Sequence, residues 1–558
     1  MPEEMLKIFS FLGEAKAEEI VVTNSNAIAD MCDIIKPCGE TKKNYPYVDN
    51  QDDLLKNICE RELKKKYNFV PIKVKNRVKW ELNAIEKTKS AFMFLQLKWV
   101  IDKLKFKSFE MSSRGMVGSS MVAYLCGITD MDPIDNDTSP FFFFGLFGDR
   151  TPDIDLNFST KSAAKVKKLL ENAPGVGKVI RAGILCVLSN NAIIDLIKDY
   201  EEPIADDEIE KIISLLKNTV KSKGRHPGGI LILPKGFDIN EVCPVSTINS
   251  GKDTVLISAF DYHSIDAMLY KLDIFAHSSM DILYKLYEAV NADSSIINLE
   301  DCKTFSIFKE RYNDIPRCAG IPEFSSEFAF ELLKKTEPKR FEDLIKISGL
   351  MHGTGTWYGN AEKILNEEDV KISCIPSNRS DIYDTLVIYG IDRNEAFLIA
   401  DEVRKGKIKR GRSRHWFDWK LMMYKKKIPG WFIRFCENAE YLFPRSHVYS
   451  YVKASWRIAW YKTHYPIHYF CVMLNERYKN GFNPTEMAMG EEKLHAFINK
   501  LRSTGQSEYE DIDNIKQTCY FLNDFYKYGF EFVKLEQQSP DEPAFEIINN
   551  HTIGYKMP

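Results

Sequence analysis

The segment from Asp153 to Phe158 alternates polar and apolar side chains, and this alternation constrains the fold more than any other feature of the chain. In a β-strand, successive side chains point to opposite faces, and residues two apart lie roughly 6 to 7 Å from each other. The apolar members are Ile154, Leu156 and Phe158, and the polar members are Asp153, Asp155 and Asn157. The pattern predicts a strand that buries one face and presents two convergent carboxylates on the other.

A third carboxylate, Asp273, lies in a second segment of the same kind. There Tyr270, Leu272 and Ile274 can pack inward, while Lys271 and Asp273 share the opposite face. Carboxylate oxygens suit Mg²⁺, and two such ions roughly 3.5 to 4 Å apart can hold the attacking and leaving oxygens of a phosphoryl displacement. We therefore predict a nucleotidyl-transfer site. Its catalytic and metal-binding residues are Asp153, Asp155 and Asp273, and its cofactor is a pair of Mg²⁺ ions, for which Mn²⁺ can substitute.

Two other interpretations of the first segment compete with this one. Two carboxylates spaced by one residue on a strand are, taken alone, more often part of a solvated face. The run Asp-x-Asp-x-Asn also begins a calcium-binding EF-hand loop. The calcium interpretation fails because Phe158 occupies the position of the required glycine and Ala164 that of the bidentate glutamate.

The overall charge is too small to drive binding to nucleic acid. The length of 558 residues suggests about three or four domains. Because the formal net charge is only −3, any binding to DNA must come from local basic patches. One such patch runs from Arg404 to Lys427 and contains Asp418 as its single acidic residue, with Trp416, Phe417 and Trp419 interleaved. Charge runs are usually solvated faces, but a basic run with aromatic residues is also typical of nucleic-acid contacts.

Gly118 and Ser119 precede a helix that we expect to begin near Ser120. Glycine lets the backbone approach a ligand closely, and consecutive N–H groups that open a helix form an anion site. An ordinary tight turn is the alternative.

Several short motifs, spread over most of the chain and in a fixed order, resemble the bacterial DNA polymerase III alpha subunit of the PolC type. They include Gly-Asp-Arg-Thr-Pro-Asp at 148–153, Gly-Arg-His-Pro-Gly-Gly at 224–229, Lys-Leu-Asp at 271–273 and Phe-Pro-Arg-Ser-His at 443–447. The others lie at 113–120, 127–129, 260–265, 320–324, 347–354, 403–407 and 454–459.

This resemblance implies an α+β, multidomain fold with a polymerase-beta-like nucleotidyltransferase palm, a helical thumb and large, mainly helical fingers. The implied domains are a remnant of the PHP domain at 1–50, the palm at 51–165 and 224–280, the thumb at 166–223, and the fingers with a C-terminal extension at 281–558. The implied activity is that of a DNA-directed DNA polymerase, with primer-template DNA and dNTPs as partners. In the family the metal-binding aspartates match Asp153, Asp155 and Asp273.

Further site residues follow from the same comparison of motifs and from the positions of cations beside them. The predicted nucleotide-binding residues are Arg114, Gly118, Ser119, His352, Arg404, Lys405 and Lys407. The predicted DNA-binding residues are Arg181, Arg225, His226, Lys271, Lys409, Arg410 and Arg412. For His226 a structural or primer-contacting role is favoured over that of a general base, because the neighbouring proline and glycines indicate a constraint on backbone shape.

The chain departs from the PolC pattern in several respects. It has no C-x-x-C motif, whereas the family usually carries a cysteine-pair zinc module just before the Pro-Asp-Ile-Asp segment. The resemblance reaches only the end of the PHP domain, and it includes neither the exonuclease nor the helix-hairpin-helix and clamp-binding parts. We therefore expect a polymerase core that lacks proofreading. Two alternatives stay open: a catalytically silent DNA-binding or replisome-interacting homologue, and one chain of a split polymerase that is completed by a second polymerase or exonuclease chain. A sliding clamp is a further candidate partner.

The scattered cysteines and the acidic beginning without a signal peptide predict a cytoplasmic protein, at the nucleoid or replication site, or in the host cell if the source is viral. The apolar run at 141–147 is far shorter than the roughly twenty residues that cross a bilayer. It is expected to be a buried strand or core plug, and no membrane partner is predicted.

The local patterns also predict secondary structure around the site. We expect amphipathic helices over about 63–99, and a helical stretch over 165–223 whose apolar stripes include Ile180, Ile184 and Leu185. A turn at 224–229 should lead into a buried strand at 230–233, and the part after about 279 should be rich in helices.

Overall fold

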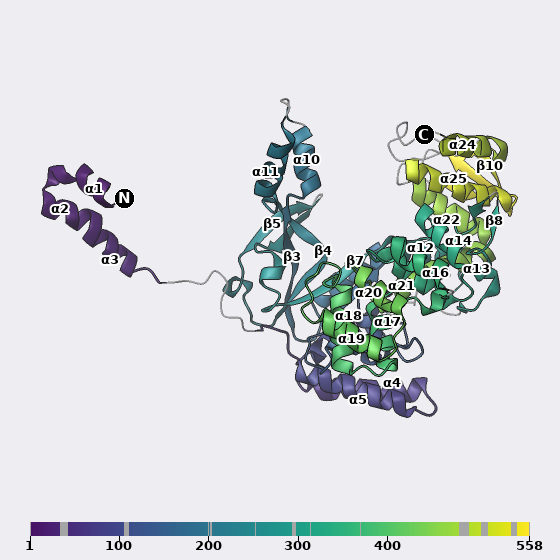
Figure 1. Cartoon of the computed structure of the whole chain (residues 1–558), viewed down its shortest axis with the longest axis horizontal. Coiled ribbons are helices and arrows are strands. Elements are labelled where there is room, and N and C mark those ends of the chain that lie inside the picture. The colour runs from purple at the N-terminus through teal and green to yellow at the C-terminus, as the bar shows by residue number, and fades with distance from the viewer. Residues whose placement is uncertain are drawn as a thin grey trace. The chain divides into compact units, whose positions relative to one another are not determined.

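The computed structural model describes residues 2–33, 43–104, 111–198, 200, 204–250, 253–292, 297–312, 314–368, 370–478, 490–503, 512–536 and 544–556 (Figure 1). The chain divides into two compact units. The smaller unit comprises Met1–Tyr45, Ile180–Arg225 and Gly236–Tyr270, and the larger unit comprises Pro46–Val179, His226–Lys235 and Lys271–Pro558. These units cut across the expected domain boundaries, because the long strands β3 (Val176–Val187) and β4 (Val220–Pro234) each pass from one unit into the other. The palm and thumb boundaries therefore stay predictions.

In the larger unit, the strands follow the order β1-β2-β7-β4-β3. The strands β1 (Met111–Arg114) and β2 (Asp155–Phe158) are antiparallel, whereas β2 and β7 (Tyr270–Ala276) are parallel. The strands at both carboxylate segments are confirmed, since Leu156, Phe158, Leu272 and Ile274 are all buried. Asp153 lies just before β2 rather than within it.

Six helices lie before, between and just after β1 and β2 in the chain, and the last of them, α9, packs against β2. They are α4 (Gln51–Lys66), α5 (Ile72–Lys87), α6 (Ala91–Leu104), α7 (Met121–Leu125), α8 (Phe141–Phe144) and α9 (Thr160–Leu170). The amphipathic helices predicted over 63–99 are therefore present. The helix predicted near Ser120 is also confirmed, because the Ser120 side chain accepts a hydrogen bond from the Ala123 N–H and caps α7.

The apolar run at 141–147 plugs the core but does not form a strand. Phe142, Phe143 and Phe144 are buried in the single turn of α8, whereas Phe147 is exposed. The turn stops at Gly145, whose φ of 81° is readily adopted only by glycine.

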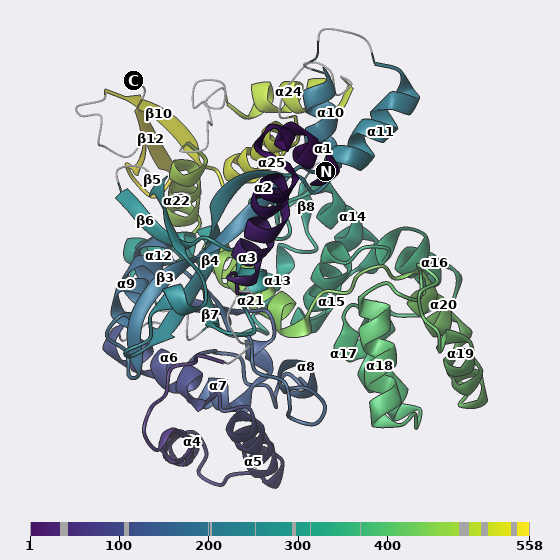
Figure 2. The ribbon, with the colours of Figure 1, turned by 90° about the vertical axis from the view of Figure 1, so that its left-hand side faces the viewer.

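The rest of the larger unit is mostly helical, as predicted. In Figure 2 the helices α14 to α20 lie together on the right-hand side. The helices of this part are α12 (Ser278–Val290), α13 (Cys302–Ser306), α14 (Glu327–Thr336), α15 (Phe341–His352), α16 (Glu362–Glu367), α17 (Arg379–Ile388), α18 (Arg393–Arg404), α19 (Trp416–Lys425), α20 (Gly430–Asn438), α21 (Arg445–His464), α22 (Pro466–Tyr478), α24 (Glu491–Ser503) and α25 (Ile512–Lys527). The central member is α21, which is buried on all sides and packs against α12, α15, α22 and β1. Because polar residues of this helix such as Ser446, Arg457 and Lys462 are buried as well, they need hydrogen-bond or ion-pair partners inside the protein.

A small sheet follows these helices and departs from the purely helical expectation. Its strands are β10 (Glu531–Leu535), β11 (Phe545–Ile547) and β12 (Thr552–Lys556), in the order β10-β12-β11. The neighbouring helix α25 is joined to α21 by a buried ion pair, in which Lys462 Nζ lies 2.9 Å from Asp524 Oδ2. Lys462 also donates hydrogen bonds to the carbonyl oxygens of Arg317 and Ala319, so its charge is fully compensated.

The smaller unit contains the other parts of β3 and β4 together with β5 (Val245–Ser250), β6 (Asp253–Ser258), α10 (Asn190–Lys198) and α11 (Asp206–Leu216). The short helices α1 (Pro2–Ile8), α2 (Glu14–Glu18) and α3 (Asn24–Asp30) complete it. β6 pairs with β5 in antiparallel fashion and with β3 in parallel fashion.

Two expectations about this region were wrong. The stretch with Ile180, Ile184 and Leu185 is the strand β3, because its valine and isoleucine residues favour an extended backbone and its apolar spacing fits either period. The predicted turn at 224–229 is instead part of the continuous strand β4. Gly228 serves close packing there, since a Cβ atom on it would lie 2.7 Å from the Phe275 ring.

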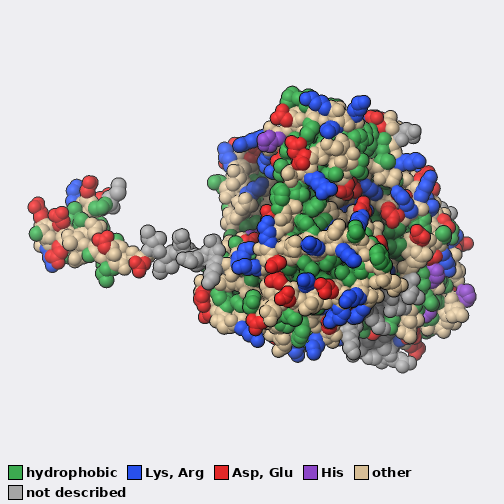
Figure 3. All heavy atoms as spheres, turned by 90° about the horizontal axis from the view of Figure 1, so that it is seen from below, with side chains coloured by type: hydrophobic (Ala, Val, Ile, Leu, Met, Phe, Trp, Pro, Cys, Tyr) green, Lys and Arg blue, Asp and Glu red, His purple; other side chains and the backbone are tan. Residues whose placement is uncertain are grey.

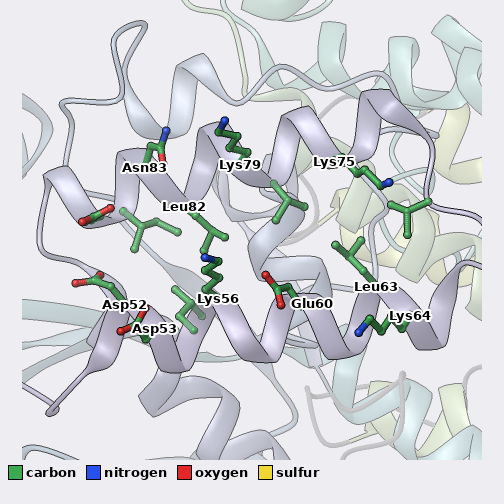
Figure 4. Close-up of a pocket in the computed structure, with 15 residues that line it drawn as sticks. Asp52, Asp53, Lys56, Glu60, Leu63, Lys64, Lys75, Lys79, Leu82 and Asn83 are labelled. Carbon is green, nitrogen blue, oxygen red and sulfur yellow. The ribbon is translucent and has the colours of Figure 1, made fainter.

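The surface seen from below carries mixed charge. Figure 3 shows one face, on which Lys and Arg side chains are interspersed with Asp and Glu. A cavity of about 620 Å³ lies between α4 and α5 and is lined by Leu63, Leu82, Lys56, Glu60 and Lys79, among others (Figure 4). None of the predicted site residues lines it. In the described part of the chain, no helix is long and apolar enough to span a bilayer.

Candidate active site

The pairing of β2 with its two neighbours brings the central charged residues together. In the parallel ladder Asp155 lies opposite Asp273, and in the antiparallel ladder Asp155 lies opposite Arg114. Burial raises the pKa of Asp155 well above its usual range, and the negative charges of Asp153 and Asp273 raise it further. Asp153 and Asp273 therefore both lie close enough to Asp155 to repel its negative charge.

Asp273 is almost fully buried and is held by a cation from its own strand. Lys271 Nζ donates a hydrogen bond of 2.6 Å to Asp273 Oδ2. On the other side, His226 Nδ1 lies 3.6 Å from Asp273 Oδ1 and accepts a hydrogen bond of 2.6 Å from the Gly229 N–H. Because that nitrogen accepts a hydrogen bond, it carries no proton, and His226 is positioned by the backbone of β4. Its direct contact with a predicted metal ligand could not be read from the sequence.

The donor set fits divalent cations, although the side chains are not in a ligating arrangement as they stand. Across the described residues, no three His, Cys, Asp or Glu side chains are placed to hold a metal ion. Two buried oxygens, Asp155 Oδ1 and Asp273 Oδ1, nevertheless lack hydrogen-bond partners within the described part of the chain. Unsatisfied carboxylate oxygens that repel each other suit Mg²⁺, which would replace Lys271 as the counter-charge of Asp273.

A glycine leaves the space that Asp155 occupies. Gly115 has a φ of 63°, and a Cβ atom built on it would lie 3.0 Å from Asp155 Oδ2. The motif Ser-Arg-Gly at 113–115 therefore supplies both a backbone conformation and room for the carboxylate.

Arg114 links this carboxylate group to the central helix α21. Its Nη1 donates a hydrogen bond of 2.6 Å to the Tyr451 hydroxyl, which also receives one from Asn157. The guanidinium lies over the Phe275 ring at 4.5 Å from the centroid. Arg114 is thus fixed beside Asp155 by strand register, by a hydrogen bond and by a cation–π contact.

A chain of contacting rings extends from Tyr451, and we call its members the histidine–aromatic chain. They are His352, Phe443, His447, Tyr451 and His277, with neighbouring ring centroids 5.1, 4.7, 4.5 and 5.3 Å apart in that order. His352 also contacts Glu323 through Nε2. The sequence had marked His352 alone as a site residue. The spacing of His447 and Tyr451, four residues apart on one helix face, was the available signal for the others.

Two histidines of this chain are neutral near pH 7. Burial, followed by the charges of Arg114, His352 and His277, lowers the pKa of His447 to about 3. Burial and Arg114 also lower the pKa of His277. These two imidazole rings therefore add no positive charge beside Arg114.

The N–H groups that follow the Gly118–Ser119 turn are already bound by a carboxylate of the protein, that of Glu81. Glu81 accepts hydrogen bonds from the Ser120 hydroxyl at 2.7 Å and from the N–H groups of Met121 and Val122 at 2.9 and 3.0 Å. Gly118 and Ser119 are fully buried. The first N–H groups of α7 are thus taken by a carboxylate, and a nucleotide phosphate would have to displace it to bind there. The assignment of this turn to nucleotide binding stays a prediction.

The chain matches known proteins along most of its length. Residues 53–205 and 188–276 match the family model of the bacterial DNA polymerase III alpha NTPase domain, and residues 277–418 match that of the bacterial DNA polymerase III alpha subunit finger domain. The chain is 30% identical to the "DNA polymerase III PolC-type" of Clostridium perfringens, over 98% of the chain and 41% of that relative. It is 30% identical to the protein of that name from Thermotoga maritima, over 98% of the chain and 44% of that relative. It is 29% identical to the one from Listeria monocytogenes, over 97% of the chain and 41% of that relative.

The chain belongs to the PolC-type DNA polymerase III alpha subunit family. It spans less than half the length of these relatives, with 44% of the Thermotoga maritima protein covered. Its α+β fold, with a mixed sheet and a large helical part, agrees with a polymerase-beta-like palm.

The fingers of this PolC-type chain hold the three predicted phosphate-binding cations in local ion pairs. Arg404 Nε lies 3.5 Å and Lys405 Nζ 2.6 Å from oxygens of Asp401, and Lys407 Nζ lies 3.4 Å from Glu402 Oε1. These cations would exchange a carboxylate for a phosphate on binding a nucleotide.

The predicted DNA-binding residues fall into separate environments. In the smaller unit, Arg181 is on β3 opposite Ile257, and Arg225 is exposed on β4. In the larger unit, Lys409 Nζ donates to Asn438 Oδ1 at 3.3 Å, and Arg410 donates to a carbonyl oxygen of the turn after α18. Arg412 is exposed. Their DNA contacts stay predictions.

Proposed function

We propose that this chain is the core of a DNA-directed DNA polymerase, which adds a deoxynucleoside monophosphate to a primer 3′ end with two metal ions. The observation that carries the proposal is the register of β2 and β7, which sets Asp155 opposite Asp273 in a chain of the PolC-type family. Primer-template DNA and dNTPs are the substrates that follow from this family.

In this proposal Asp153, Asp155 and Asp273 hold the metal ions. A bound pair of Mg²⁺ ions would make the primer hydroxyl more acidic and neutralise charge on the triphosphate. The protein's own part is to position the reactants, as is usual for phosphoryl transfer. Arg114 keeps Asp155 and Tyr451 in a fixed relation, and Lys271 balances the charge of Asp273 until cations bind.

The test is primer extension by the full chain with Mg²⁺, comparing the wild type with Asp155→Asn and Asp273→Asn. Both variants keep the side-chain shape but lose the charge that binds metal. Several kcal/mol of transition-state stabilisation depend on the metal, so we expect the rate to fall by about a thousandfold or more. The matched control is Asp102→Asn, since Asp102 is an exposed carboxylate on α6.

Extension by Asp155→Asn at the wild-type rate would overturn the proposal. Absence of extension by the wild type, together with retained binding to primer-template, would favour a catalytically silent homologue. A wild type that extends only when a second polypeptide is added would favour the split-polymerase alternative. The sliding clamp and the missing exonuclease stay predictions.

A further inference from the structure

The helix α19 has one buried face and one solvent-exposed face. Trp419 and Met423 are 7% and 0% exposed and pack into the core of the fingers. On the other side Phe417, Leu421 and Tyr424 are 72%, 45% and 52% exposed. Their spacing of four and three residues aligns them in one stripe along the helix. A contiguous exposed apolar surface rimmed by polar residues is typical of an interaction site.

Uncompensated cations lie at both ends of this stripe. Arg412 and Arg414 precede α19, and Lys425, Lys426 and Lys427 end it or follow it. No ion pair to a described residue is formed by any of these five cations, in contrast with Lys420, whose Nζ lies 2.6 Å from Glu437 Oε1. Asp418 is the single acidic residue between Arg404 and Lys427. The surface therefore consists of two exposed rings, Phe417 and Tyr424, with Leu421 between them and a positive cluster at each end, and we call it the α19 stripe.

We infer that the α19 stripe binds the single-stranded part of the template. This inference rests on the proposed function and extends it to a second contact with the same substrate. Exposed rings let unpaired bases stack on them, and cations beside the rings neutralise the phosphates. Duplex DNA offers its phosphates but not the faces of its bases, so it would use only the cations.

The dimensions of the stripe suit a short single strand. Phe417 and Tyr424 are seven residues apart, which corresponds to about 10 Å along a helix. Stacked bases are spaced at about 3.4 Å, so two or three nucleotides can lie over the stripe. The clusters at its ends are placed to meet the phosphates that enter and leave. An acidic protein segment would contact the cations but has no bases to stack on Phe417 and Tyr424, and single-stranded DNA, which uses both the rings and the cations, is therefore the better match.

The experiment measures binding of a fluorescently labelled oligothymidylate to the full chain by anisotropy. Removing both rings in Phe417→Ala/Tyr424→Ala should weaken binding at least tenfold, because each stacked base contributes appreciably. Replacing Lys425, Lys426 and Lys427 by Gln should lower the salt dependence of binding by roughly 0.7 for each phosphate that is no longer neutralised. The control is Phe69→Ala, since Phe69 is 82% exposed but lies in the turn between α4 and α5.

The readouts separate this inference from the proposed function. With a template overhang of one nucleotide, the ring variants should extend primers like the wild type, whereas with a long overhang their KM for DNA should rise. If the wild type does not extend primers at all, the proposed function fails, yet oligothymidylate binding still tests the stripe. Equal oligothymidylate binding by the wild type and the ring variants overturns the inference. Preferential binding of a labelled polyglutamate peptide, abolished in the same variants, overturns it in favour of an acidic protein partner.

Discussion

Glu81→Gln is the substitution that most directly tests how the Gly118–Ser119 turn is held. Glu81 is completely buried on α5, and each of its two oxygens accepts two hydrogen bonds. Oε1 accepts from Arg77 Nε and Met121 N, and Oε2 accepts from the Ser120 hydroxyl and Val122 N. The charge of the carboxylate also favours the N-terminus of α7 and pairs with Arg77.

The expected cost follows from this geometry. Glutamine keeps one acceptor oxygen, whereas its NH₂ group must face two donors in either orientation. Two buried donors are then left without a partner, and each of them costs about 1 to 3 kcal/mol. Rotation of the Ser120 hydroxyl relieves part of this cost, so we expect the first turn of α7 to be destabilised by roughly 3 kcal/mol. That corresponds to about a hundredfold in an opening equilibrium.

Hydrogen–deuterium exchange of the peptide that contains Met121 and Val122 measures this opening directly. In Glu81→Gln the two amides should exchange about a hundredfold faster than in the wild type. The control is Glu86→Gln, because Glu86 is exposed on the same helix. Wild-type exchange rates in Glu81→Gln would refute the claim that this carboxylate holds the turn.

Two further predictions concern the carboxylate site and the buried ion pair. Gly115→Ala should slow primer extension, because the new Cβ atom crowds Asp155 Oδ2. The control is Gly236→Ala, since Gly236 has a similar positive φ but open space around it, and its substitution should cost only the backbone strain of about 1 to 2 kcal/mol. Equal effects of the two substitutions on primer extension would contradict the crowding argument. Lys462→Met should destabilise the chain by about 3 to 5 kcal/mol, since it leaves Asp524 buried with a weakened counter-charge. In thermal unfolding the double variant Lys462→Met/Asp524→Leu should recover much of this stability, and a double variant less stable than the single would contradict the reasoning.

The carboxylate strands could be predicted because their information is local. The alternation around Asp155 and Asp273 specifies two strands with buried apolar faces, and both are present. The carboxylates on both strands suggested one shared metal site, and the motif resemblance supported that grouping. The parallel register of β2 and β7 depends on how two distant segments pair in the folded sheet, so the local sequence does not specify it.

The errors in the strand region arose where local patterns allow two structures. The apolar residues of β3, such as Ile180 and Ile184, are spaced as on a helix, but pairing with β6 keeps the backbone extended. The Pro-Gly-Gly sequence after His226 usually marks a turn. In β4 Gly228 instead leaves room for the Phe275 ring, and no local signal predicts that packing.

Long-range contacts explain most of what the sequence did not predict within the site. Glu81 reaches the helix α7 from the helix α5, and a capping carboxylate so far upstream has no recognisable spacing. The histidine–aromatic chain likewise joins residues from three separate segments, and within it Phe443, His447 and Tyr451 alone are close in sequence. For the cations Arg404 and Lys405, the sequence showed charge but not the partner Asp401 that neutralises them.

The pairing of β2 with β7 also governs when the site is assembled during synthesis. Most of the smaller unit lies between these two strands in the chain, so Asp155 leaves the ribosome long before Asp273 does. Contacts between residues so distant in sequence form slowly, because a large loop must close first. A nascent polypeptide arrested within the smaller unit has half of the carboxylate pair, and a slip of one residue when β7 docks would turn Asp273 to the opposite face. Assembly of the carboxylate pair is therefore a late event in folding, and it depends on reaching the correct strand register.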